Sequence, residues 1–155
     1  MTIEIKIAVK PVIKKYLAAK VKTDPMILSK TNAYGIFLYN CLVRITSSKV
    51  KLCLRDNGVD IDKYTEVINV KISEDMWRRV GWYVHPLKQA DFNKFIAKML
   101  DDEFHYFMDV QIQEMSHKIY PSFLKFREKF DFTEDDMPIK TMEKNYERYR
   151  CYLTV

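Results

Sequence analysis

The sequence predicts an α+β protein that is predominantly helical and contains a small antiparallel sheet. Apolar residues alternate with polar ones over residues 3–7, 50–54 and 67–72, which is the pattern of half-buried strands. Elsewhere they recur mainly every third or fourth position, as in amphipathic helices. The 155 residues are 48% hydrophobic and include only three glycines. The chain can therefore bury a core, and we expect little disorder.

The first elements are a strand and a helix. Ile3, Ile5 and Ile7 alternate with polar residues, so we expect a short strand. Pro11 suits the first turn of a helix that ends near Lys20. This helix has an apolar stripe, and four lysines lie largely on its other side: Lys10, Lys14, Lys15 and Lys20. After a turn at residues 23–25, the sequence predicts a helical turn over 25–29.

A third helical piece and a ribbon complete the first part. Thr31 or Asn32 can cap a helix that continues to residue 43, and its near lack of charge indicates burial. The strand at 50–54 ends at the turn residues 56–58 and is expected to pair with the strand at 67–72 as an antiparallel ribbon. Residues 1–73 therefore follow the general order of a winged-helix domain.

The second part, residues 74–155, is predicted to be helical, although one compact unit with the first part is possible. Ser73 can cap a helix that Pro86 stops, with Tyr83 and Val84 on its apolar face. The main core helix is expected from near Asp91 to about residue 117. Two further helices, at 122–130 and from Pro138 to 150, follow across a tight connection, which is the layout of a helix-turn-helix.

Charge is distributed unevenly along the chain. Residues 1–55 hold eleven Lys and Arg against two acids, a balance of +9, whereas residues 56–136 have a balance of −6 and residues 137–155 one of +2. The total is only +5. Such asymmetry favours a polyanionic partner more strongly than the total does.

The last helix is the main candidate for nucleic-acid contact. We expect Lys140, Lys144, Arg148 and Arg150 to meet phosphates, Thr141 and Asn145 to face base edges, and Tyr149 to pack on sugar or on the protein. The lysines of the first helix would add a second phosphate-contacting surface. The alternative is an ordinary solvated face on which Glu143 and Glu147 balance the lysines.

Other chemistry is poorly supported. No phosphate-binding glycine loop, nucleophile elbow or histidine-based triad is present, so we expect no enzyme, no cofactor and no small-molecule substrate. The three cysteines are widely spaced, and Cys41 and Cys53 are interpreted as small buried residues. Without a signal peptide or a membrane-spanning stretch, a cytoplasmic location is expected.

The histidines and the tryptophans suggest metal binding or base stacking, but each has a simpler structural interpretation. Asp102 with His105 and Glu114 with His117 have the spacing of di-iron ligands, but on one helix the pairs would lie about 18 Å apart, so no metal site is expected. His85 is interpreted as a turn or capping residue. Trp77 and Trp82 could stack on the bases of a single strand, but aromatic residues at helical spacing belong to a core far more often.

Two resemblances suggest what the chain binds. The strand at 67–72, the capped helix from Ser73 and the motif Phe92-Asn-Lys-Phe-Ile resemble a ribbon-helix-helix unit. That resemblance implies a dimer in which Asn69 and Lys71 of the strand, together with Thr65 before it, enter the major groove; plain alternation explains the strand without DNA.

Taken whole, the chain is similar to small uncharacterised proteins of phages and mobile elements of Bacteroides-type bacteria. The similarity lies in residues 10–17, 70–73, 92–95 and 132–150. It implies a DNA-binding role in a bacterial host cell. We therefore expect a double-stranded DNA-binding transcription regulator or replication accessory factor; the leading alternative is a protein-interaction module, and a homodimer is possible.

Overall fold

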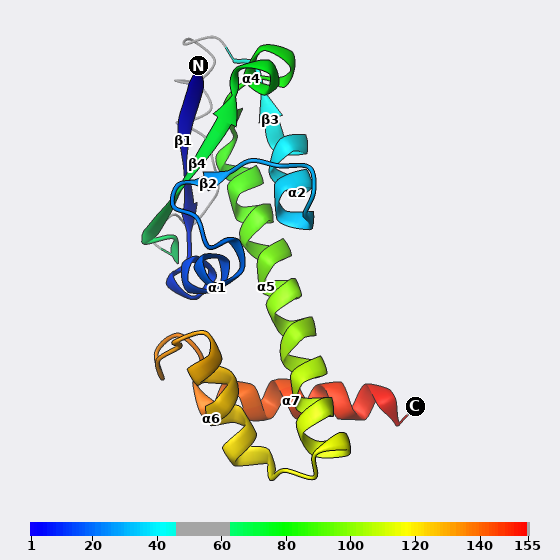
Figure 1. Ribbon diagram of the computed structural model, residues 1–155. Helices are drawn as coiled ribbons and strands as arrows, with labels where there is room; N and C mark the ends of the chain where they lie inside the picture. Colours follow the sequence, from blue (N-terminus) through cyan, green and yellow to red (C-terminus); the bar gives the residue numbers. More distant parts are fainter. Residues whose placement is uncertain (46–62, 155) are drawn as a thin grey trace. The chain divides into compact units, whose positions relative to one another are not determined.

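The structure is a computed structural model that describes residues 1–45 and 63–154 (Figure 1). It is an α+β fold, 61% helical, with six helices and a small mixed sheet among these residues. The predicted α+β, mainly helical class is thus confirmed, whereas the sheet was expected to be antiparallel. The chain divides into two compact units, Met1–Ile96 (unit 1) and Ala97–Val155 (unit 2). This division falls within one helix, whereas the sequence suggested a boundary at Ser73. The predicted strand at 50–54, its turn at 56–58 and Cys53 lie outside the described residues.

Unit 1 contains a three-stranded sheet in the order β1-β4-β2. The long strands β1 (Thr2–Val9) and β4 (Glu66–Ser73) are antiparallel, with Ile5 opposite Val70, and both were predicted. The short strand β2 (Met26–Ile27) runs parallel to β4 on its other side. β4 is therefore the central strand, and its described antiparallel partner is β1.

Strand β2 replaces the helical turn predicted at residues 25–29, and that prediction is wrong. Helix α1 (Pro11–Val21) forms as expected, but Met26 and Leu28 are buried while Ile27 between them is 62% exposed. This alternation suits a strand, and the Leu28 amide donates to the Lys71 carbonyl at 2.9 Å. A helical piece that the winged-helix order needs is thus a strand.

Helix α2 (Ala33–Cys41) begins where the sequence predicted. The Asn32 side chain caps it by accepting a hydrogen bond from the Gly35 amide at 2.7 Å. The helix is less buried than expected, because Ile36 is 45% exposed. It also ends before residue 43, where strand β3 (Leu42–Val43) pairs with β5 (Tyr83–Val84).

Helix α4 (Glu74–Val80) is capped by Ser73, whose hydroxyl accepts from the Met76 amide, as predicted. Its predicted continuation to Pro86 is wrong, because the chain leaves the helix at Gly81 with φ of +108°. A Cβ at this position would lie 2.2 Å from the Val43 carbonyl carbon. Only glycine permits this close approach, which lets the chain turn into β5.

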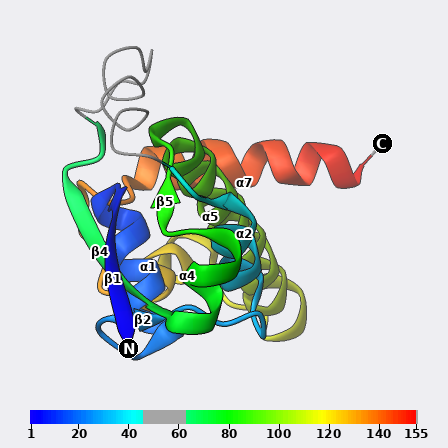
Figure 2. The same cartoon turned by 90° about the horizontal axis from the view of Figure 1, so that it is seen from above.

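Helix α5 (Pro86–Asp109) starts five residues before the predicted position, because Pro86 begins this helix and does not stop the previous one. The predicted capping role of His85 is confirmed, since its Nδ1 accepts a hydrogen bond from the Leu87 amide at 3.1 Å. Figures 1 and 2 show α2 and the sheet beside the first half of α5. The ring of Phe37 on α2 stacks on Phe95 of α5, with centroids 4.7 Å apart.

Two amide side chains of α5 bind the outer edge of β1. Gln89 accepts a hydrogen bond from the Ala8 amide at 2.9 Å. Asn93, only 2% exposed, accepts from the Lys10 amide at 3.0 Å and donates to the Ala8 carbonyl at 2.9 Å. These bonds satisfy backbone groups that have no strand partner there, so they fix the end of β1 on α5.

We expect Asn93→Ala to lower the free energy of unfolding by about 3 kcal/mol, because it leaves the partly buried amide of Lys10 and carbonyl of Ala8 without these partners. Urea unfolding followed by circular dichroism measures the change. The neighbouring exposed variant Lys94→Ala is the control and should change stability by about 0.5 kcal/mol or less. Equal stability of the two variants would contradict this role of Asn93.

Unit 2 consists of the second half of α5, a π-helix η2 (Val110–Glu114), α6 (Ile119–Lys129) and α7 (Ile139–Leu153). The two last helices were predicted, whereas α5 ends before residue 117. Phe126 lies at the centre of the core, with its ring centroid 5.1 Å from that of Phe104 and 5.2 Å from that of Phe130.

The connection between α6 and α7 is longer than the tight turn expected. Nine residues, 130–138, lie between the two helices. They are packed, because Phe132 and Met137 are buried. The Thr133 and Asp136 side chains also accept hydrogen bonds from each other's amides, at 3.3 and 2.9 Å. The layout therefore differs from a helix-turn-helix, whose turn has only three or four residues.

Candidate nucleic-acid interface

Helix α7 has a buried face and a basic face. Met142 and Tyr146 are buried in unit 2. Lys140, Lys144 and Arg148, spaced four residues apart, are exposed. Residues four apart lie on one side of a helix, about 6 Å apart along its axis. The three cationic groups therefore form a single stripe, which we call the α7 stripe.

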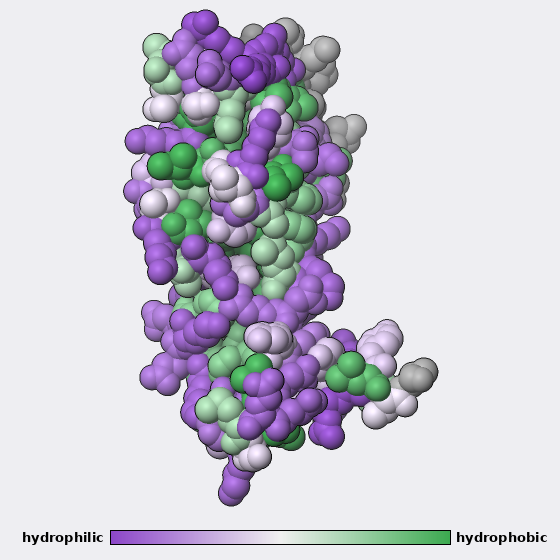
Figure 3. Space-filling model, turned by 45° about the vertical axis from the view of Figure 1, so that its right-hand side comes forward, coloured by the Kyte–Doolittle hydropathy of each residue, from purple (hydrophilic) through white to green (hydrophobic). Residues whose placement is uncertain are grey.

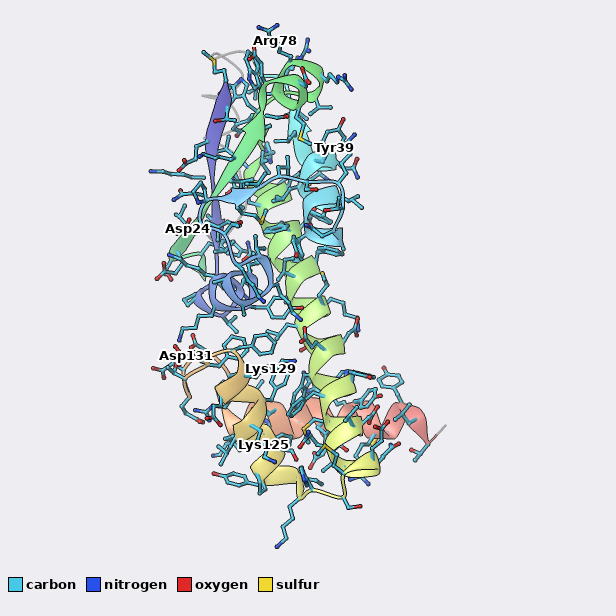
Figure 4. All side chains as sticks on the ribbon, viewed as in Figure 1. Asp24, Tyr39, Arg78, Lys125, Lys129 and Asp131 are labelled. Atoms are coloured by element: carbon cyan, nitrogen blue, oxygen red, sulfur yellow. The ribbon has the colours of Figure 1, made fainter. Side chains whose placement is uncertain are left out.

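The α7 stripe has no ion-pair partner among the described residues, in contrast to three other cations of unit 2. Lys98 pairs with Asp102 at 2.7 Å, Lys129 with Glu103 at 3.0 Å, and Arg127 with Glu134. Figure 4 shows Lys125 and Lys129 on α6. Neither Glu143 nor Glu147 forms a described ion pair with the stripe, although both lie next to it on α7. The charge of the stripe is thus available to an anion.

Arg150 and the predicted base-contacting residues are placed differently. The Arg150 guanidinium lies 5.8 Å from the centre of the Tyr146 ring. Thr141 is exposed beside the stripe. Asn145 is half-buried: its Oδ1 accepts from Nε2 of His105 at 2.6 Å, and its Nδ2 donates to Asp101 at 2.9 Å. Its amide is therefore engaged within the protein, away from a base-reading role.

Tyr149 packs on the protein, which was one of its two predicted positions. Its ring stacks on that of His105, with centroids 4.1 Å apart and planes 6° apart. Its hydroxyl donates a hydrogen bond to the carboxylate of Asp109. That hydrogen bond, supported by desolvation, raises the pKa of Tyr149 to about 12. These contacts fix α7 against α5 and orient the stripe outward.

The sequence did not predict this network of Asp101, His105, Asp109, Asn145 and Tyr149. Its members lie on α5 and α7, about forty positions apart in the chain. Their spacing within α5, four residues from Asp101 to His105 and four more to Asp109, was a usable signal, because it places all three on one side of the helix.

The lysines of α1 are more heterogeneous than the α7 stripe. Lys14 pairs with Glu66 at 2.9 Å, and the Lys20 ammonium lies 5.6 Å from the Tyr16 ring centre. Lys10 is exposed and Lys15 half-buried. These lysines belong to unit 1, whereas the α7 stripe belongs to unit 2, so they are surfaces of different units.

The strand residues suggested for groove recognition lie on or next to the central strand. Lys71 and Thr65 are exposed and Asn69 is half-buried. β1 pairs with the whole length of β4, and β2 bonds to its other edge at Val70 and Lys71. At these positions β4 is therefore already paired within the chain, whereas a ribbon-helix-helix dimer would need it to pair with a second copy.

The histidines of the metal-like spacings make hydrogen bonds of their own. His105 contacts Asn145, and His117 Nδ1 lies 2.6 Å from Gln111 Oε1. Among the residues that the structure describes, no group of three or more His, Cys, Asp or Glu could hold a metal ion. Cys41 is buried, as predicted, and its burial raises the pKa of the thiol.

Comparisons with protein-family models, with curated proteins and with solved structures found no match. In the described part of the chain, no helix is both long and apolar enough to cross a membrane. Hydrophilic side chains cover most of the face shown in Figure 3.

The hydrogen bond to Asp109 gives a testable titration. In an ultraviolet titration of the ten tyrosines, subtracting the curve of Tyr149→Phe from that of the unaltered protein should isolate one tyrosine with a midpoint near pH 12. The folded-state pKa is raised, so the contribution of Tyr149 to stability is complete below its ordinary pKa of about 10 and is lost as the pH rises to 12. Asp109→Asn should return the midpoint toward 10. A midpoint near 10 in the unaltered protein would disprove the interaction.

Proposed function

We propose that the protein binds double-stranded DNA by contacting its phosphates with Lys140, Lys144 and Arg148. The observation that carries this proposal is the α7 stripe itself: three exposed cationic side chains on one side of a helix, with no carboxylate partner among the described residues. The other face of α7 is fixed by buried Met142 and by the Tyr149–Asp109 hydrogen bond. The stripe is thus presented on a rigid support.

Phosphate neutralisation accounts for affinity in this arrangement. Each cation that contacts a phosphate releases condensed counterions, which favours binding most at low salt. Lysines act on phosphates as point charges, and contacts to phosphates carry no sequence information. Asn145 is engaged with Asp101 and His105, so Thr141 is the predicted base-contacting side chain that α7 still exposes. We therefore propose contact with limited sequence preference.

The charges of the two units support a role in DNA binding for both of them. Unit 1 contains seventeen Lys and Arg against nine acids, whereas unit 2 contains nine against twelve. The net positive charge of unit 1 attracts DNA over a distance, with the α1 lysines among its cations. In unit 2 the attraction is local to the stripe. A regulator or replication accessory factor of a phage or mobile element needs such a surface, and that biological role is part of the proposal.

The double variant Lys144→Ala/Arg148→Ala tests the assignment. We expect weaker binding to mixed-sequence duplex, and a plot of log affinity against log salt whose slope is shallower by about 2, since each lost phosphate contact removes about 0.9. Fluorescence anisotropy with a labelled duplex over a range of salt concentrations measures both quantities.

The matched control is Lys118→Ala/Lys125→Ala, which removes the same charge from α6 and its N-cap residue. It should change the salt slope less than the α7 variant does. If both variants lose affinity equally, net charge explains binding, and if the α7 variant binds duplex like the unaltered protein, α7 is not the interface.

A protein partner is a second candidate function, favoured by exposed apolar side chains in unit 2. Tyr120 and Leu124 are exposed four residues apart on α6, and Tyr152 and Leu153 at the end of α7. Such side chains form docking surfaces when they gather in a patch. Nucleic acid that co-purifies and is removed by a high-salt wash would support the DNA proposal over this one.

A further inference from the structure

We propose that a hollow beside α4 binds an unpaired base of single-stranded nucleic acid. The hollow lies within unit 1, has a volume of about 400 Å³, and is lined by Arg44, Ile45, Trp77, Arg78 and Trp82. Its volume falls in the range of sites that take small organic groups. This site is separate from the α7 stripe, and the inference does not depend on duplex binding.

One of the two tryptophans that line the hollow is unusually accessible to solvent. Trp82 directly follows Gly81 and is 41% exposed, although tryptophan is ordinarily well buried. Its ring meets the edge of Tyr83, with centroids 6.2 Å apart and planes 80° apart, which supports it from one side. This departs from the core role expected of aromatic residues. A base can stack on an exposed indole whatever its sequence.

The charged component of the hollow suits a nucleic-acid backbone. Arg44 is exposed and forms no described ion pair. Arg78 projects from α4 into solvent (Figure 4); its guanidinium pairs with Glu74 and lies 5.8 Å from the centre of the Trp77 ring. No carboxylate is among the lining residues that the structure describes. Guanidinium groups bind phosphate bidentately and stack on planar rings, so the hollow combines both contacts.

An unpaired base fits these features better than a base within a duplex. In a duplex both faces of each base are covered by neighbouring pairs, whereas an unpaired base offers a face for stacking. The ligand class is therefore single-stranded DNA or RNA, with one base against Trp82 and adjacent phosphates near Arg44 and Arg78.

The protein itself reports on this site, because Trp77 and Trp82 are its two tryptophans and both line the hollow. Titration of the full chain with a short oligothymidylate should quench tryptophan fluorescence saturably. Trp82→Ala should weaken binding roughly tenfold or more, the loss expected for one stacked base, as measured by anisotropy of a labelled oligothymidylate. Trp82→Phe retains a stacking ring, so its affinity should lie between those of the unaltered protein and Trp82→Ala.

Controls separate this proposal from the duplex proposal and from misfolding. Lys144→Ala/Arg148→Ala should leave the fluorescence quenching by oligothymidylate unchanged, whatever it does to duplex binding. Arg44→Gln keeps both indoles and should weaken binding with a shallower salt slope, by about 0.7. The proposal is overturned if neither oligothymidylate nor a matched oligoribonucleotide quenches the fluorescence. It is also overturned if Trp82→Ala binds oligothymidylate like the unaltered protein.

Discussion

Each compact unit builds its core on apolar side chains of α5. Five of them, at four-residue intervals, are at most 4% exposed: Phe92, Ile96, Leu100, Phe104 and Met108. The first two belong to unit 1 and the last three to unit 2. Burying each of these side chains contributes about 1.5–3 kcal/mol, so their combined burial is large relative to the usual stability of a domain, about 5–15 kcal/mol. The proposed surfaces depend on this burial, because it fixes the helix on which the other elements pack.

Polar side chains on α5 then fix orientation, which apolar burial alone does not. In unit 1, Asn93 bonds to the backbone at the end of β1. In unit 2, Asp101 and Asp109 receive hydrogen bonds from Asn145 and Tyr149 of α7. Hydrogen bonds are directional, whereas hydrophobic burial is not. The same helix thus determines how β1 and α7 are rotated about their axes, and with them which side chains face solvent.

The local spacing of apolar residues predicted the helices and strands whose own side chains alternate or repeat. It missed the strands that form only by pairing with distant parts of the chain. Strands β1 and β4 and helices α1, α6 and α7 follow from apolar spacing. β2 and β5 have only two residues each and form because β4 and β3 bind them, so a local pattern cannot identify them. The exposure of Lys144 and Arg148 was predictable from helical spacing, but the engagement of Asn145 was not, since its partners lie about forty residues away.

The two proposed surfaces differ in chemistry, and this difference bears on sequence choice. The α7 stripe carries two lysines and one arginine, exposed cations that suit phosphate oxygens, whose contacts carry no sequence information. The hollow beside α4 carries two guanidinium groups and two indoles, all planar, which suit the face of a base. Stacking depends weakly on base identity, and Asn145, the residue best suited to read a base edge, is occupied. If both proposals hold, we expect the protein to distinguish paired from unpaired nucleic acid more readily than one sequence from another.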